Sequence, residues 1–147
     1  MNDKGSAESI ASAFDPAANG WEIITGVGFG ELIGPLWKRT DEGRVRFGFT
    51  VVHKHLNRAG NLHGGMLMTF ADQAMAMTGR EATGGKRHAT MDLNIQFIGA
   101  ARLGEFVEAV PEVVRVTRSV IFLQVKMYVG DRIVVSSNGI WKIIGEP

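Results

Sequence analysis

Cysteine is absent from the 147 residues of the chain. Its absence excludes disulfide bonds, a cysteine nucleophile and thiolate ligands for zinc or iron–sulfur clusters. Four histidines are present, so only histidine and carboxylate side chains remain as metal ligands. The composition fits a reducing compartment, and we expect a cytoplasmic protein.

The chain also lacks an excess of charge and a long apolar run. The chain has sixteen Lys and Arg residues and fifteen Asp and Glu residues, which gives a net charge of +1. Nucleic-acid-binding domains are usually far more basic. No segment approaches the ~18 apolar residues of a membrane helix, and the first residues do not read as a signal peptide. We therefore expect a soluble protein that binds neither nucleic acid nor membrane.

The length suits one domain, and no repeat or linker divides it. Residues 1–20 are small and polar, and Asp15-Pro16 breaks regular structure there. We predict that residues 1–20 form a peripheral N-terminal segment, with a short helix from Ser6 to Phe14. Residues 21–147 are predicted to form a single domain.

Alternating apolar and polar residues predict several strands. Glycines at 26, 28, 30 and 34 make the first of them loose, and Pro111 indicates a bulge or an edge position. Gly130-Asp131 is typical of a hairpin turn, and Asn138-Gly139 of a bulge. The predicted strands start near residue 27 and then cover residues 44–51, 90–97, 105–117, 119–129 and 132–143.

One long helix is predicted after His63, ending near Gly79. Its apolar residues cover nearly the whole circumference, which is typical of a core helix. One helix does not cover both faces of a large sheet. We therefore predict an α+β fold with five or six antiparallel strands wrapped around this helix, and oligomerisation to cover the remainder.

Two features of this helix point to chemistry. Gly64-Gly65 at its start leaves backbone N–H groups free, which suits a developing oxyanion. Asp72 is the only acid in an apolar run, so its carboxylate must be paired, hydrogen-bonded or functional. Taken singly, Asp72, Asn57, His63 and Thr90 also have purely structural explanations, such as a turn or a helix start.

The combination of residues is more specific. Asn57, Gly60, His63, Gly64, Gly65, Thr69 and Asp72 form the pattern N-x-x-G-x-x-H-G-G-x-x-x-T-x-x-D. This pattern resembles the hotdog-fold thioesterases of the PaaI-like (4-hydroxybenzoyl-CoA thioesterase) superfamily. The likeness spans about residues 27–143. It departs from many relatives at Ile98-Gly99-Ala100, where they carry a proline.

The resemblance implies hydrolysis of an acyl- or aryl-CoA thioester, with no cofactor besides the coenzyme A in the substrate. The Gly64 N–H would bind the thioester oxygen, at a site shaped by Asn57 and His63. Asp72 would act as the general base or as the nucleophile, and Thr90 would help to hold the attacking water.

The strand alternation predicts that the Thr90 hydroxyl shares a face with Asp92 and Asn94. The resemblance also implies that the Asn/His/Gly group and the Asp/Thr group come from opposite subunits of a homodimer or homotetramer. Further substrate-binding candidates are Gly65 and Thr69 and, for the coenzyme A phosphates, Arg102 first, then Arg87, Arg115 and Arg118.

Three alternatives remain open. Other hotdog proteins are enoyl-CoA hydratases or dehydratases, and an acyl-CoA binder without activity is a further option. His53, His55, His63 and Asp92 are candidate metal ligands, but no helical metal motif accompanies them. We predict no metal site.

Overall fold

The computed structural model describes residues 13–145. Over this range the chain forms one large sheet and two α-helices. In chain order the elements are β1 (Glu22–Ile24), α1 (Phe29–Ile33), β2 (Leu36–Asp41), β3 (Arg44–Thr50), α2 (Gly64–Ala82), β4 (Arg87–Phe97), β5 (Phe106–Val116), β6 (Val120–Val129) and β7 (Arg132–Ile144). Short 3-10 turns cover Ala17–Asn19 and His53–His55.

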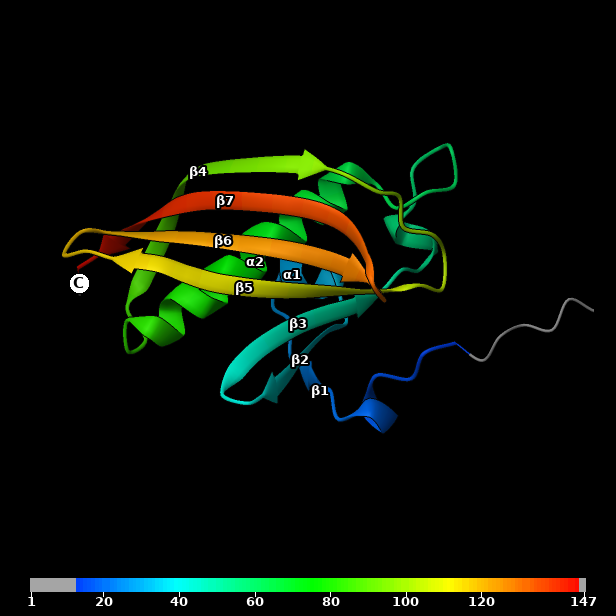
Figure 1. The fold of residues 1–147 in the computed structure, drawn as a ribbon, viewed down its shortest axis with the longest axis horizontal. Coiled ribbons are helices and arrows are strands. Elements are labelled where there is room, and N and C mark those ends of the chain that lie inside the picture. Colours follow the sequence, from blue (N-terminus) through cyan, green and yellow to red (C-terminus); the bar gives the residue numbers. More distant parts are fainter. Residues whose placement is uncertain (1–12, 146–147) are drawn as a thin grey trace, which may run out of the picture.

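The sheet is antiparallel throughout and wraps around α2, as predicted. Its strand order is β1-β2-β3-β5-β6-β7-β4, so β1 and β4 are its two edges. In Figure 1, β4 to β7 cross the view in front of α2, and β1 to β3 curl away below them. The sheet has seven strands within residues 13–145, and the predicted five or six is therefore too low.

The helix α2 is the centre of the core. Its buried residues are Met66, Leu67, Phe70, Ala71, Ala74, Met75 and Gly79. Phe70 meets Phe49 of β3 edge to face at 4.7 Å between ring centroids, and burying such a side chain stabilises the fold by about 1.5–3 kcal/mol. The helix runs past the predicted end at Gly79 to Ala82. It ends before Gly84 and Gly85, whose φ angles of 68° and 92° are left-handed.

The segment near residue 27 was predicted wrongly as a strand. The structure has the short helix α1 there, between β1 and β2. Gly28 precedes α1 with a φ of 58°. A Cβ at Gly26 would lie 2.7 Å from the backbone nitrogen of Glu31. The glycines therefore permit a bend before α1 and its close packing. The additional strand of the structure, which the prediction did not contain, is β1.

Two local strand predictions have different outcomes. Pro111 pairs with Val125 of β6 and lies beyond the last residue of β5 that pairs with β3, Ala109. Pro111 therefore occupies an edge position, one of the two predicted options. Asn138 and Gly139 stay in register with both neighbouring strands, so no bulge lies there. Gly139 is needed for space instead, because a Cβ would lie 2.7 Å from the Trp141 ring.

The described part of the N-terminal segment contacts the sheet. The Phe14 ring lies 4.7 Å from that of Phe106, and Pro16 is buried. The predicted helix from Ser6 falls almost wholly on residues 1–12, outside the described range. No helix within residues 13–145 is long and apolar enough to span a membrane. The cytoplasmic location stays a prediction.

Candidate active site

The Asp72 carboxylate and the Thr90 hydroxyl form the first half of the candidate site. Thr90 Oγ1 of β4 donates to Asp72 Oδ1 of α2 at 2.6 Å. Asp72 is half-buried and Thr90 is exposed. Because an ionised carboxylate only accepts hydrogen bonds, the hydroxyl proton points to Asp72 and the hydroxyl lone pairs stay free. Asp72 Oδ2 accepts no hydrogen bond from the described residues.

A β-bulge turns Thr90 toward α2. Thr90 pairs with Trp141 and Asp92 pairs with Ile140, so Met91 is the extra residue. Trp141 belongs to the buried core beside α2, and Thr90 shares that inner face. Asp92 lies on the outer face, where Asn94 donates to it at 2.9 Å. The prediction that Thr90 shares a face with Asp92 and Asn94 is therefore wrong, because strict alternation fails at the bulge.

The start of α2 forms the second half. His63 caps the helix, and its Nδ1 accepts the Gly65 N–H at 2.8 Å. In a neutral ring the proton is then on Nε2, which can donate to a ligand. The Gly64 N–H donates to no acceptor in residues 13–145. A Cβ at Gly64 would lie 3.3 Å from the Phe97 ring, so a larger residue here would press on Phe97.

Asn57 closes the loop that leads into the helix. Its Oδ1 accepts the N–H groups of Ala59 at 2.9 Å and Asn61 at 3.2 Å. Its backbone N–H donates to the Asn61 carbonyl at 2.8 Å. Asn57 is therefore a turn residue, and its exposed side-chain NH₂ stays available to a ligand.

The two halves do not meet within one chain. Gly64 and Asp72 lie eight residues apart on α2, which corresponds to about 12 Å along the axis at ~1.5 Å per residue. One thioester carbon does not contact both residues at that separation.

An apolar pocket of about 410 Å³ lies between α1 and the start of α2. Gly65 and Thr69, both predicted to bind substrate, line it. Thr69 Oγ1 donates to the Gly65 carbonyl at 2.9 Å, so this hydroxyl is used within the helix. The other lining residues are Phe29, Leu32, Ile33, Lys54, His55, Leu56, His63 and Met66. The wall contributed by α1 was missed because that segment was predicted as a strand.

The four candidate arginines lie at two ends of the sheet. Arg102 pairs with Asn61 in an isolated bridge, next to the loop that leads into α2. Arg115 lies near the other end of β5, about 30 Å from its first residue Phe106 at ~3.3 Å per residue. Arg118 follows it in the β5–β6 turn, and Arg87 begins β4 opposite Ile144. Arg102 is therefore the one nearest the helix start within a chain.

The proposed metal ligands are not gathered. Within residues 13–145, no three His, Asp or Glu side chains form a group that could hold a metal ion. Both ring nitrogens of His55 have hydrogen-bond partners. The Val52 N–H donates to Nδ1 at 3.1 Å, and Nε2 lies 2.7 Å from the Ile33 carbonyl.

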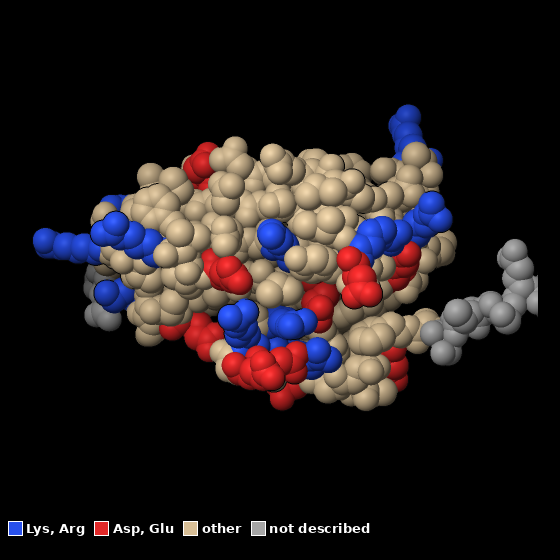
Figure 2. All heavy atoms as spheres, in the orientation of Figure 1, with Lys and Arg blue, Asp and Glu red and all other residues tan. Residues whose placement is uncertain are grey.

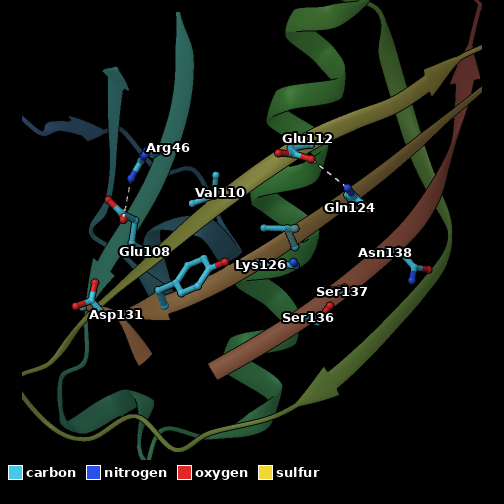
Figure 3. Close-up of a pocket in the computed structure, with 13 residues that line it drawn as sticks. Arg46, Glu108, Val110, Glu112, Gln124, Lys126, Asp131, Ser136, Ser137 and Asn138 are labelled. Atoms are coloured by element: carbon cyan, nitrogen blue, oxygen red, sulfur yellow. Dashed lines mark hydrogen bonds and ion pairs between the residues drawn. The ribbon is translucent and has the colours of Figure 1, made fainter. Parts of the chain in front are cut away.

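A further hollow of about 570 Å³ lies on the outer face of the sheet. Figure 3 shows two pairs in it, Arg46 with Glu108 and Gln124 with Glu112, and α2 lies behind the sheet. The Gln124 amide donates to Glu112 at 3.0 Å. Charged side chains of both signs gather over β2 and β3, and others lie at both ends of the sheet (Figure 2). The sheet separates this groove from Asp72 and Thr90, so it is not part of the candidate active site.

The family model of the Thioesterase superfamily matches residues 59–136. A Pseudomonas aeruginosa protein named "Putative esterase PA0474" is 31% identical over 118 residues, covering 77% of this chain and 86% of that protein. The human "Acyl-coenzyme A thioesterase 13" is 28% identical over 85 residues, covering 58% of this chain and 61% of that protein.

Solved structures share the fold. Zebrafish thioesterase superfamily member 2 superimposes with a TM-score of 0.73 at 24% identity, covering 81% of this chain and 88% of that one. A structure of a "Hypothetical Thioesterase Protein with Coenzyme A" from Streptococcus pneumoniae gives a TM-score of 0.67 at 22% identity, covering 85% of this chain and 98% of that one. The wrapped sheet and central helix are those of the hotdog fold. The chain belongs to the Thioesterase superfamily, and its class is that of a thioester hydrolase.

Proposed function

We propose that the protein hydrolyses acyl-CoA thioesters in a homodimer, at two sites that each combine residues from both subunits. The observation that carries the proposal is the Thr90–Asp72 hydrogen bond of 2.6 Å, which sets a hydroxyl of β4 beside a carboxylate of α2. The coenzyme A bound to the similar Streptococcus pneumoniae protein supports the substrate class.

The Asp72–Thr90 pair positions and activates water. The water donates one proton to Asp72 Oδ2 and the other to the free lone pair of Thr90 Oγ1. Its oxygen then points at the thioester carbon. As the water oxygen bonds to that carbon, Asp72 takes the proton, which is general-base catalysis worth roughly 10²–10⁴ in rate.

The start of α2 stabilises the negative charge that forms. The carbonyl oxygen accepts the Gly64 N–H, with the Asn57 NH₂ and His63 Nε2–H as further donors. One such donor contributes roughly 10²–10³ in rate. The tetrahedral intermediate collapses with cleavage of the C–S bond. The coenzyme A thiolate takes the proton back from Asp72, and the free acid leaves.

The edge strand β4 supports a dimer that brings these halves together. β4 pairs with β7 on one side only, and its Met91 and Phe97 are 61% and 55% exposed. Long exposed edges with apolar side chains are usually paired or covered. A second copy joined at β4 through a two-fold axis would set the two α2 helices antiparallel. Each Asp72 would then approach the partner helix start.

A panel of acyl-CoAs with a thiol-detecting assay tests the proposed function. We expect release of free thiol and acid, with Asp72→Asn as the inactive control. Hydration of an enoyl-CoA without thiol release would contradict the proposal in favour of a hydratase. Tight acyl-CoA binding without any turnover would contradict it in favour of a binding protein.

Water attack is distinguished from attack by Asp72 itself by a single turnover in H₂¹⁸O. Water attack places the label in the released acid. A nucleophilic Asp72, with its acyl anhydride opened by water at the Asp72 carboxyl carbon, would instead give an unlabelled acid and a labelled protein carboxylate.

A further inference from the structure

His55 is a buried polar residue that the proposed reaction does not use. Its side chain is 4% exposed, and its ring lies edge to face against Phe49 at 5.2 Å. The Val52 N–H donates to Nδ1 at 3.1 Å, and Nε2 lies 2.7 Å from the Ile33 carbonyl. Because a carbonyl only accepts, Nε2 carries the proton and Nδ1 does not. Both contacts therefore require the neutral ring in one tautomer.

The same residue also holds the start of α2. The His55 backbone carbonyl accepts the His63 N–H at 2.8 Å. His63 in turn accepts the Gly65 N–H through its side chain. A continuous series of hydrogen bonds thus runs from the end of α1, through His55, to the first turn of α2.

The helix α1 depends on this series because it is short. It has five residues and no buried side chain, and an isolated helix of that length is unstable in water. Phe29 and Leu32, which line the pocket beside α2, are 60% and 70% exposed. The contact from Ile33 to His55 is therefore an anchor that fixes α1 against the pocket.

We infer that His55 is a positioning residue that fixes α1 over the start of α2 and so determines which acyl groups the pocket between them accepts. The inference rests on the proposed function. Acyl groups long enough to reach Phe29 and Leu32 bind against α1, whereas the shortest acyl groups end before it. His55 therefore affects long substrates and not short ones.

The environment of His55 favours the neutral ring. Burial lowers its pKa below the ordinary value of 6.5; the hydrogen bond to Ile33 opposes this, and the positive charge of Lys54 adds to it. Lys54 and His63 are the other titratable residues that line the pocket, and none of the lining residues is a carboxylate. Protonation of Nδ1 breaks the bond from Val52, whereas Nε2 still donates to Ile33. Acid therefore loosens the turn on which His55 lies, and with it the position of the anchor.

Two variants and a matched control test the inference. His55→Gln keeps an N–H that reaches the Ile33 carbonyl and has no charge at any pH. His55→Leu removes the anchor. His53→Leu is the control, because His53 is exposed on the same turn. The readouts are kcat and KM for the longest and the shortest acyl-CoA that the wild type hydrolyses, and amide hydrogen exchange of Leu32 and Gly34.

In His55→Leu we expect KM for the longest substrate to rise roughly tenfold, the scale on which pockets discriminate small apolar differences. The shortest substrate should change by less than about twofold, and α1 amides should exchange faster. His55→Gln should restore the long-substrate KM and keep it constant as the pH falls. His53→Leu should match the wild type.

Equal losses for both substrates, without rescue by glutamine, would show a purely structural role and overturn the inference. Unchanged kinetics and exchange in His55→Leu would also overturn it, because α1 would then be held by other contacts. If the wild type hydrolyses no acyl-CoA, the proposed function fails. The exchange of Leu32 and Gly34 then still decides whether His55 anchors α1.

Discussion

Thr90 Oγ1 donates to Asp72 Oδ1 at 2.6 Å because a bulge at Met91 turns the threonine toward α2. Without the extra residue, Thr90 would lie on the outer face with Asp92. The bulge therefore places the hydroxyl next to Asp72, the carboxylate in the apolar middle of α2. The pair leaves one carboxylate oxygen and one hydroxyl lone pair facing the same space, which is the arrangement that a water molecule requires.

Replacing the Asp72 carboxylate with an amide should nearly abolish hydrolysis. Asp72→Asn keeps the shape and the bond from Thr90 but removes the base, so kcat should fall by roughly 10²–10⁴. Asp92→Asn is the matched control, because Asp92 lies on the outer face. Steady-state kinetics and thermal unfolding check both variants. A folded Asp72→Asn protein with normal turnover would remove Asp72 from the mechanism.

The Thr90 hydroxyl should contribute a smaller factor. Thr90→Val keeps the shape and loses one hydrogen bond to a charged group, worth about 1.5–3 kcal/mol. We expect kcat to fall by roughly 10–100-fold, and Thr90→Ser to recover most of it. If valine and serine variants had equal activity, the hydroxyl would have no part in holding the water.

Arg102 should hold a phosphate of coenzyme A beside the helix start. Exposed ion pairs weaken with screening, so KM should rise with salt concentration. Arg102→Ala should raise KM more than it lowers kcat, and should reduce the salt dependence. Arg44→Ala, in the β2–β3 hairpin, is the control for a lost surface charge. A KM that responds neither to salt nor to Arg102→Ala would place the phosphates elsewhere.

The stability of the fold should decrease in mild acid through His55. Its pKa in the folded state is lowered, chiefly by burial. The contribution of His55 to the unfolding free energy is therefore complete above pH 6.5, the ordinary pKa of histidine. It is lost as the pH falls below that value. The pKa of His88 is also lowered, by burial and by the charge of Arg80, and acts in the same direction. Comparing the wild type with His55→Gln separates the contribution of His55 to the pH dependence of stability from that of His88.

Urea unfolding at about pH 7.5 and about pH 5.5 measures this effect, above the range in which most carboxylates titrate. The wild type should lose more unfolding free energy between the two pH values than His55→Gln does. Equal losses would show that His55 contributes no pH dependence.

The central helix was predictable because its apolar residues repeat at helical spacing, and Asp72 stood out as the single acid among them. The bulge at Met91 was not predictable, since alternation continues through it in the sequence. The helix α1 was missed because its flanking glycines mimic a loose strand, and the pocket wall that α1 forms was missed with it. The anchoring contact of His55 joins residues 22 positions apart, and no local pattern indicates such a contact.

The meeting of the two half-sites across a dimer is the central claim. Gly64 and Asp72 are about 12 Å apart on one helix. Each chain alone therefore holds two half-sites that do not reach the same thioester. Two variants break one half each. Asn57→Asp keeps the Oδ1 that closes the loop and places negative charge beside the oxyanion. Asp72→Asn removes the base. Each variant should be inactive alone and should fold normally.

Subunit mixing of these two variants is the most direct measurement. After unfolding and refolding together in equal amounts, about half of the dimers are hybrids, and each hybrid has one intact site. Activity should therefore return to about a quarter of the wild-type value, with hybrids quantified by a mass tag on one variant. Hybrids that form at the expected fraction and remain inactive would place the whole site within one subunit and contradict the account.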